Sequence, residues 1–334
     1  MEVTGKNIVS AVDSSSLKQS RVLLLLKIWQ YGVTKFCSML SVVLTVFFIP
    51  ALVRWQTRRK VTILYYHDPR PEVFERHLLY MSKRYNFITI DELADAFNNK
   101  DWSQFPCHPL LITIDDGYRG NFDLLEICKN NGVRPLIYLC SEVIGTSRGF
   151  WDRHIPSGVR ELLKSLESQI RKKVLKDKYK FDFEEEQRSR EALSRDEIKI
   201  MRDYFDFGSH TKFHEILTTC EDNQCEDEIV QSKEDLERKL EVDCRHFSFP
   251  NGDHDLRERE FVKRAGYLTA RTIDIGWNDS DTDPFRLKAI GVGDDAPTYS
   301  LGGRLTGIPL YLKRLLAGGN FYGRHKTVKI NKFC

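Results

Sequence analysis

From Val61 onward the chain alternates short runs rich in β-forming residues with stretches of helical periodicity. In residues 73–85, for example, Phe74, Leu78 and Met81 repeat at spacings of four and three and form a one-sided apolar stripe. Strands that alternate with helices indicate βα units whose strands lie parallel in one sheet. About seven such units predict an α/β fold that closes into a barrel rather than an open doubly wound sheet.

The predicted barrel occupies residues 61–300 and follows a different kind of segment in residues 1–60. That segment contains an uncharged apolar run over residues 36–53, with a shorter apolar patch before it. About 20 apolar residues cross a bilayer, so the run is just long enough for a signal anchor or a membrane-lying hairpin. A buried hydrophobic helix, or a signal peptide with a long n-region, is the alternative.

We therefore expect a membrane-associated chain, with one membrane pass and a catalytic domain outside the cytoplasm. The charges flanking the apolar run do not fix this orientation, because Lys and Arg occur on both sides of it.

Two further segments depart from the alternating pattern. Residues 153–195 are strongly charged and poor in strand signals, which predicts a helical insertion with a solvated face or a lid. Residues 301–334 form a basic, glycine-containing tail that either touches a membrane surface or packs as a final helix.

Composition excludes several classes of function. The formal net charge of +3 is too small to favour nucleic acid as a partner. The 8 cysteines contain no CxxC pair, so a thiolate zinc site is not expected. In a chain of 334 residues they are expected to be mostly free thiols, with a local Cys220–Cys225 bridge as the alternative.

Two adjacent aspartates follow one of the most apolar predicted strands, in the segment LLITIDDGY. Asp115 and Asp116 cannot both ionise cheaply side by side, unless one binds a cation and the other acts as a base. Gly117 permits a sharp turn directly after them. The structural alternative is that the aspartates cap the helix that begins near Asn121.

Two histidines four residues apart follow another strand-like run, in FGSHTKFHEIL. In a helical turn this spacing would place His210 and His214 on one face, where both can bind one metal ion. Thr211 stands where a zincin would carry its glutamate base, so the base has to come from elsewhere, and Asp115 or Asp116 can supply it.

Reactive residue types end further predicted strands. The predicted strand in TILYYHD ends at His67, and the one in RHFSFPNG ends in residues 250–252. A further strand ends in TIDIGW, near Asp274 and Trp277. In barrel enzymes the carboxyl ends of the strands face the active site. The sequence therefore predicts one site built from several strand ends.

The motif TIDDG at residues 113–117, followed by HTKFH at residues 210–214, resembles the polysaccharide deacetylase family, also known as the NodB-homology domain or carbohydrate esterase family four. The resemblance spans roughly residues 61–295 and implies a distorted (β/α)7 barrel. It also implies that Asp115 is the catalytic base and that Asp116, His210 and His214 bind a divalent metal. Zn²⁺ is the expected ion, with Co²⁺ or Ni²⁺ as alternatives.

The chain departs from the family pattern in its third and fifth motifs. The arginine that usually precedes Pro-Pro-Tyr-Gly is missing from its register in SFPNG, although Arg245 is nearby, and no Leu-x-His follows near the C-terminus. The segment ILYYHD resembles a circularly permuted branch that includes poly-N-acetylglucosamine deacetylases. That resemblance implies His67 as the general acid, and a hydrogen-bonded core histidine is the alternative.

The remaining site residues receive supporting roles. The Asn251 backbone amide is a candidate oxyanion donor. Asp274 is expected to orient His67, and Trp277 to wall the pocket.

The function implied by the resemblance is removal of N-acetyl groups from an amino-sugar polysaccharide or glycoconjugate. Two alternatives stay open. One is a membrane-tethered saccharide-binding protein with a decayed site, which the missing arginine and histidine favour. The other is an amidase or deformylase that acts on a small or lipid-linked sugar.

Overall fold

One parallel sheet forms the centre of the computed structural model, which describes residues 29–41 and 49–316. Its strands lie in the order β7-β6-β5-β4-β3-β1-β8, with β2 paired to β3, and every paired neighbour is parallel. The strands are β1 (Thr62–Tyr66), β2 (Asn86–Phe87), β3 (Pro109–Ile114), β4 (Leu136–Leu139), β5 (Asp206–Ser209), β6 (His246–Ser248), β7 (Thr269–Arg271) and β8 (Ile290–Gly291).

The segment that leads into β8 joins the two ends of the sheet. At Leu287 it exchanges backbone hydrogen bonds with the β7 edge: Leu287 N donates to Ala270 O, and Thr272 N donates to Leu287 O, each at 2.9 Å. A few residues later Ile290 pairs with Leu64 of β1. The prediction of an α/β fold with a distorted barrel is therefore confirmed.

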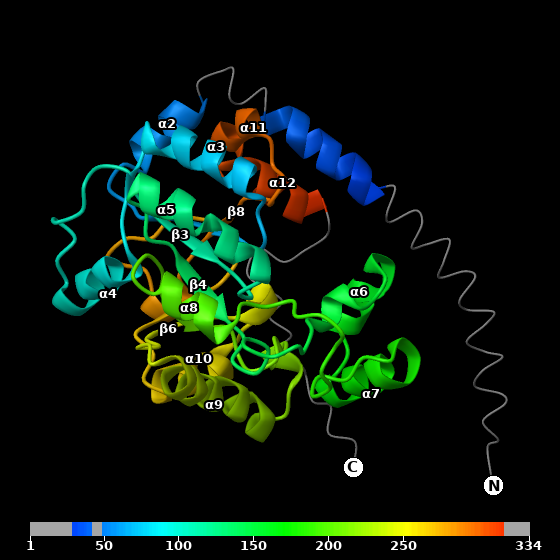
Figure 1. Ribbon diagram of the computed structural model, residues 1–334. Helices are drawn as coiled ribbons and strands as arrows, with labels where there is room; N and C mark the ends of the chain where they lie inside the picture. The colour runs from blue at the N-terminus through cyan, green and yellow to red at the C-terminus, as the bar shows by residue number, and fades with distance from the viewer. Residues whose placement is uncertain (1–28, 42–48, 317–334) are drawn as a thin grey trace, which may run out of the picture.

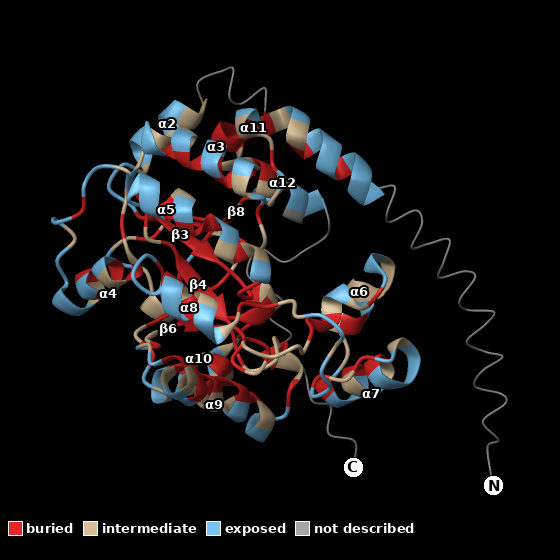
Figure 2. Ribbon diagram, in the orientation of Figure 1, coloured by how far each residue is buried: buried red, intermediate tan, exposed pale blue. Residues whose placement is uncertain are grey.

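Helices cover the outside of this sheet (Figure 1). In Figure 2 the strands are almost wholly buried, whereas each surrounding helix exposes one face. The predicted stripe of Phe74, Leu78 and Met81 is fully buried on α3. The covering helices are α3 (Pro71–Ser82), α4 (Ile90–Asn99), α5 (Leu125–Asn131), α8 (Arg195–Met201), α9 (Asp222–Leu240) and α10 (Leu256–Arg264).

The N-terminal and C-terminal helices lie together on one side of the barrel (Figure 1). They are a helix over residues 29–41, α2 (Ile49–Gln56), α11 (Thr298–Arg304) and α12 (Ile308–Leu316). Within the described ranges, no helix is both long and apolar enough to span a bilayer. Residues 42–48, the middle of the apolar run, lie outside those ranges.

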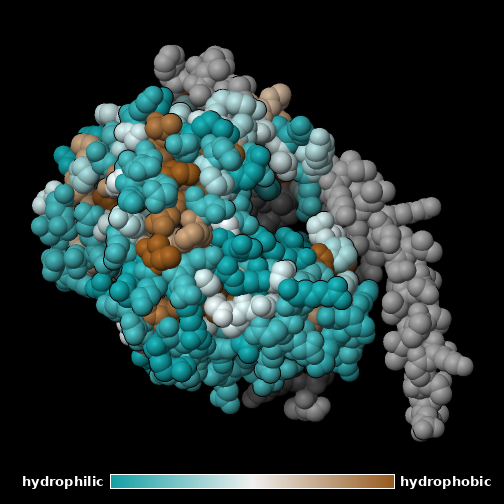
Figure 3. Space-filling model, in the orientation of Figure 1, coloured by the Kyte–Doolittle hydropathy of each residue, from teal (hydrophilic) through white to brown (hydrophobic). Residues whose placement is uncertain are grey.

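The charged segment 153–195 contains two helices and stands beside the barrel (Figure 1). It contains α6 (Ser157–Lys164) and α7 (Ser168–Tyr179), preceded by the short helix η2 (Trp151–Arg153). An apolar cluster of its own, which includes Trp151, Leu175 and Phe181, holds it together. Its outer face belongs to the mostly hydrophilic surface seen in Figure 3.

The described cysteines are free thiols, as expected for most of them. Cys220 and Cys225 are both buried and unbridged, so the alternative of a local disulfide is wrong. Burial raises the pKa of the Cys220 thiol to about 12, which keeps it protonated at neutral pH.

Gly117 provides a test of the turn that ends β3. Its φ is +76°, and a Cβ there would lie 2.5 Å from Leu139 Cδ2. Gly132 has a similar φ of +61°, but its Cβ would meet open space. We expect Gly117→Ala to lower the free energy of unfolding by about 2–4 kcal/mol, from backbone strain plus overpacking, and Gly132→Ala by about 1 kcal/mol, from strain alone.

Urea unfolding of the two alanine variants measures this difference. Equal losses of stability would show that the close approach of Gly117 to β4 is not a constraint on the turn.

Candidate active site

The carboxyl ends of the strands surround a pocket of about 440 Å³. His67 follows β1, the pair Asp115 and Asp116 follows β3, and His210 and His214 follow β5. All five of these residues line the same pocket. Residues from separate stretches of the chain thus meet at the edge where barrel enzymes carry their active sites.

Asp116, His210 and His214 form a compact cluster whose ligand atoms all lie within 4.8 Å of one another. Asp116 Oδ1 lies 3.4 Å from His210 Nε2 and 3.2 Å from His214 Nε2. Asp116 and His210 are buried, and His214 is partly exposed. One carboxylate and two imidazoles are a common protein ligand set for a catalytic zinc ion.

The hydrogen bonds of His210 fix which of its nitrogens faces the cluster. Its Nδ1 lies 2.7 Å from Ser248 O, and because a carbonyl oxygen only accepts, Nδ1 carries the proton. The Nε2 lone pair therefore faces Asp116. Burial lowers the pKa of His210 to about 4, so the ring is neutral at physiological pH, as a metal ligand must be.

Asp116 has the charge and the unsatisfied oxygen that a cation site requires. Burial acts to raise its pKa, but His214, His67 and His210 lower the pKa by more, so the carboxylate is ionised. Its Oδ1 is buried and accepts no hydrogen bond within the described part of the chain. An orphaned carboxylate oxygen between two imidazole nitrogens fits a divalent cation, because the cation would satisfy all of these groups.

The loop that carries the two histidines is not the helical turn that their spacing suggested. Thr211 and His214 have φ values of +67° and +59°, and this left-handed backbone prevents a helical hydrogen-bond ladder. Glu228 of α9 holds the loop by accepting the backbone N–H groups of Lys212, at 2.8 Å, and Phe213, at 3.2 Å. Asp116 is left-handed too, with φ +72°. Such strained residues cluster at functional sites.

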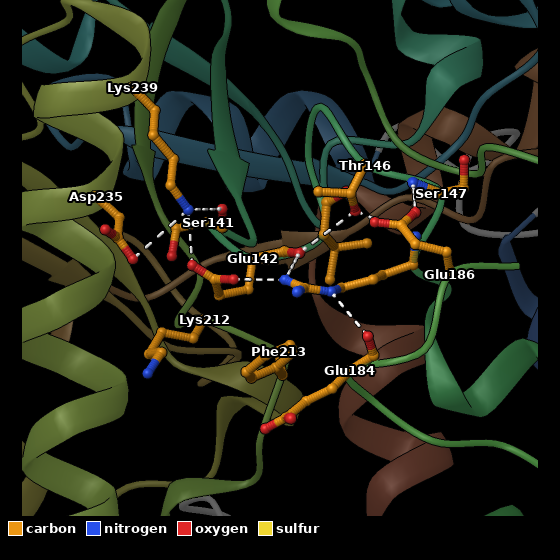
Figure 4. Close-up of polar contacts among 12 residues, drawn as sticks. Ser141, Glu142, Thr146, Ser147, Glu184, Glu186, Lys212, Phe213, Asp235 and Lys239 are labelled. Carbon is orange, nitrogen blue, oxygen red and sulfur yellow. Dashed lines mark hydrogen bonds and ion pairs between the residues drawn. The ribbon is translucent and has the colours of Figure 1, made fainter.

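Hydrogen bonds from the end of β4 also hold this loop (Figure 4). Ser141 N and Glu142 N donate to the carbonyls of Thr211 and Lys212 at 3.1 and 3.0 Å. The Glu142 carboxylate accepts from Lys239 at 2.7 Å and from Arg148. Burial alone would raise the pKa of Glu142, but these two cations outweigh burial and lower the pKa to about 2.

Arg148 and its neighbour Ser147 also contact the charged segment, and Figure 4 shows Ser147 beside Glu186. Arg148 Nε donates to Glu184 O at 3.4 Å, and Ser147 N donates to the Glu186 carboxylate. One network therefore joins α9, the histidine loop and the insertion.

Asp115 is held by an arginine, Arg271, that none of the sequence motifs indicated. Arg271 Nη2 donates to both oxygens of Asp115 and, at 2.6 Å, to Ser248 Oγ. The guanidinium also contacts the rings of Tyr65 and Tyr138, whose centroids are 4.8 and 5.3 Å away. Arg271 is only 1% exposed, so this is a buried ion pair.

Arg245, the arginine noted near the third motif, lies at the opposite end of the barrel. It precedes β6 and pairs with Asp91, at 2.9 Å, and with Asp243. The signal for Arg271 was present in the run YLTARTI, since an arginine inside a buried strand needs a partner.

The residues that were expected to play supporting roles separate into two groups. Asn251 lines the pocket with φ +57°, and its Oδ1 accepts from Lys164 at 2.8 Å. Asp274 instead pairs with Arg286 at 3.0 Å, and Trp277 packs on the main core. Neither is among the residues that line the pocket. The wall position predicted for Trp277 is occupied by Trp151 of η2.

Residues 103–270 match the family model described as polysaccharide deacetylase. This chain belongs to the polysaccharide deacetylase family. The match includes the aspartate pair and both histidines, and it confirms the resemblance seen in the sequence motifs. A comparison with curated proteins finds no match.

Solved structures support the fold. The chain is similar to the deacetylase PplD of Streptococcus pyogenes, solved in complex with acetate, with a TM-score of 0.54 and 16% identity over 72% of this chain and 96% of that one. It is similar to IcaB from Ammonifex degensii, with a TM-score of 0.54 and 15% identity over 73% and 97% of the two chains. A de-N-acetylase from Aggregatibacter actinomycetemcomitans has the same TM-score, with 13% identity over 73% and 99%.

The Arg271–Asp115 ion pair is expected to contribute to the free energy of unfolding. Arg271→Met would leave the Asp115 carboxylate buried without its cation, and we expect a loss of about 3–5 kcal/mol in the free energy of unfolding. Arg245→Met removes two solvent-exposed ion pairs, with Asp91 and Asp243, and we expect a loss of about 0–1 kcal/mol. Urea unfolding of both variants measures the contrast, and comparable small losses would contradict a buried ion pair at Asp115.

Proposed function

We propose that the protein is a divalent-metal-dependent deacetylase that removes N-acetyl groups from an amino-sugar polysaccharide or glycoconjugate. One observation carries the proposal: two adjacent carboxylates have different environments. Asp116 faces the two imidazoles, whereas Asp115 faces Arg271. Family membership supports the substrate class, and the split environments support different roles for the two aspartates.

Asp116, His210 and His214 would hold the metal ion, with Zn²⁺ as the first candidate and Co²⁺ or Ni²⁺ as alternatives. Such an ion supplies Lewis acidity that polarises an amide carbonyl and acidifies water. The neutral His210 and the ionised Asp116 are in the protonation states that binding requires.

Asp115 is the proposed general base, which removes a proton from the attacking water. Arg271 donates to both oxygens of Asp115 from one side and so fixes the orientation of the carboxylate. His67, at the end of β1 and on the pocket wall, is the proposed general acid that protonates the departing nitrogen. The backbone amide of Asn251 would donate to the developing oxyanion. The products are acetate and a free amino sugar.

The alternative of a decayed, saccharide-binding site loses its main argument. That alternative was favoured by the missing third-motif arginine and the missing fifth-motif histidine. Arg271 supplies a cation to Asp115 from β7, and His67 is the proposed replacement for the histidine. An amidase or deformylase acting on a small or lipid-linked sugar uses the same groups, and acyl specificity distinguishes it from a deacetylase.

We also propose that residues 1–60 attach the protein to a membrane. Support comes from the apolar run 36–53 and from Trp29, Phe36 and Met39, which expose large apolar side chains on the helix over residues 29–41. These features do not favour one side of the membrane.

Acetate release from N-acetylglucosamine oligomers by the purified full-length chain, supplied with Zn²⁺, tests the proposed chemistry. We expect Asp115→Asn to retain the metal but to lower turnover about 10²–10⁴-fold, because loss of a general base costs that much. We expect His210→Ala to lower the bound metal, whereas Arg245→Met should change neither quantity. Normal turnover by Asp115→Asn would refute the base, and unchanged metal in His210→Ala would refute the ligand set.

A further inference from the structure

The charged insertion contributes basic side chains to the wall of the active-site pocket. Arg160 and Lys164 stand four residues apart on α6, so they share one helix face, and both line the pocket. Arg153 of η2 lines it as well. The solvated helical face that the sequence suggested for this segment is therefore accompanied by a second, basic face turned to the active site.

The carboxylates of the pocket are already matched with partners. Asp115 pairs with Arg271, Asp116 faces the two histidines, and Asp294 accepts the backbone N–H of His67. Asp68 pairs with Arg153 at 2.8 Å, and Asp152 lies 3.6 Å from Arg160 Nη1. Among the described residues, Lys164 pairs with none of these pocket carboxylates.

Lys164 is mostly buried, with 19% of its side chain exposed, so its charge is only partly solvated. Its Nζ donates to Asn251 Oδ1 at 2.8 Å, and its only ion pair within the described residues is a longer contact of 3.3 Å to the exposed Glu161. An ammonium group has three protons, so these contacts leave donor capacity. The contact to Asn251 places this cation beside the strand end after β6.

Arg160 also has unused donors. Its Nη2 donates to Asp152 O at 2.9 Å, its contact to the Asp152 carboxylate is long, and its buried Nε has no hydrogen-bond partner in the described part of the chain. The side chain is 37% exposed, so the rest of the guanidinium can be reached from the pocket. A guanidinium fork next to an ammonium is a suitable combination for an anionic oxygen cluster.

The insertion is firmly tied to the active-site loop. Glu215, the residue after the proposed ligand His214, is fully buried and pairs with Arg171 of α7. Lys172 adds a contact of 3.1 Å and Ser168 a hydrogen bond of 3.0 Å to the same carboxylate. Arg171 also donates to Leu166 O, in the link between α6 and α7, at 3.1 Å. The basic face of α6 is thus held in place relative to the proposed reacting groups.

We propose that Arg160 and Lys164 form an anion-binding subsite, and that the natural substrate carries a phosphate or carboxylate group close to the N-acetylated sugar. This inference rests on the proposed deacetylase function. A neutral N-acetylglucosamine polymer would offer these cations no anionic group, whereas an anionic substituent would pair with the donors that Asp152, Glu161 and Asn251 leave unused. The subsite would therefore select an acidic glycan or a phosphorylated sugar.

The experiment compares three matched substrates at constant ionic strength: a neutral N-acetylglucosamine oligomer, the same oligomer bearing a 6-phosphate, and one in which a glucuronate adjoins the acetylated sugar. The full-length, Zn²⁺-supplied chain is compared with an Arg160→Gln/Lys164→Gln variant and with Lys173→Gln. Lys173 is an exposed cation on α7 that does not line the pocket, so it is the matched control.

We expect kcat/KM for at least one anionic substrate to exceed that for the neutral oligomer by about tenfold or more in the wild type and in Lys173→Gln. The double variant should lose this advantage, so that its kcat/KM values for the anionic and neutral substrates become similar. The anion that gives the larger advantage identifies the natural group. Equal rates on all three substrates, or an advantage that survives in the double variant, would overturn the subsite.

A binding measurement separates this proposal from the deacetylase assignment. Calorimetry with glucosamine 6-phosphate and with glucosamine needs no turnover. Tighter binding of the phosphate by the wild type but not by the double variant would support the subsite even if no substrate were deacetylated. Deacetylation of the neutral oligomer, without discrimination in either assay, would support the function and refute the subsite.

Discussion

The buried ion pair between Arg271 and Asp115 is the interaction on which the rest of the site depends. Two neighbouring aspartates at the end of β3 would otherwise compete to remain neutral, because adjacent buried carboxylates repel each other when both are charged. Arg271 balances one of these charges, and the imidazoles of His210 and His214 face the other. The same two-residue segment can therefore present one carboxylate held by an arginine and one that faces the proposed metal site.

The barrel makes this division possible. Because its strands are parallel, residues that follow β1, β3, β5 and β6 meet at one edge although they are far apart in the sequence. The left-handed backbone at Asp116, Thr211, His214 and Asn251 then aims individual side chains. Such conformations are costly, and the surrounding contacts hold them: Glu228 and the β4 loop brace the histidine loop.

Local sequence patterns were enough to predict the fold and to select five residues that the structure brings together in one pocket. Alternating strands and helices indicated the barrel, and reactive residues at strand ends indicated Asp115, Asp116, His67, His210 and His214. Arg271 was missed because its contact with Asp115 spans 156 residues and depends on the register of β6 with β7, which pairs Arg271 with Ser248. The spacing of His210 and His214 suggested a helix, but it says nothing of the left-handed backbone at Thr211.

Residues 153–195 show the same limit, because a local sequence pattern does not reveal contacts between distant segments. Arg160 and Lys164 are spaced like any pair on a solvated helix face, so the sequence alone could not separate them from the other charges of residues 153–195. What distinguishes them is the position of α6 against the barrel, held by the buried pair of Arg171 with Glu215. Asp274 shows the reverse case, since it follows a strand yet is paired with Arg286 and does not line the pocket.

Asp116, His210 and His214 are proposed to bind one divalent ion. The X-ray absorption spectrum at the zinc edge, taken from the full-length chain loaded with one equivalent of Zn²⁺, tests this proposal most directly. We expect a first shell of only nitrogen and oxygen at about 2.0–2.2 Å, with the outer-shell scattering of two imidazoles. A sulfur shell at about 2.3 Å, or a spectrum unchanged in His210→Ala, would contradict it.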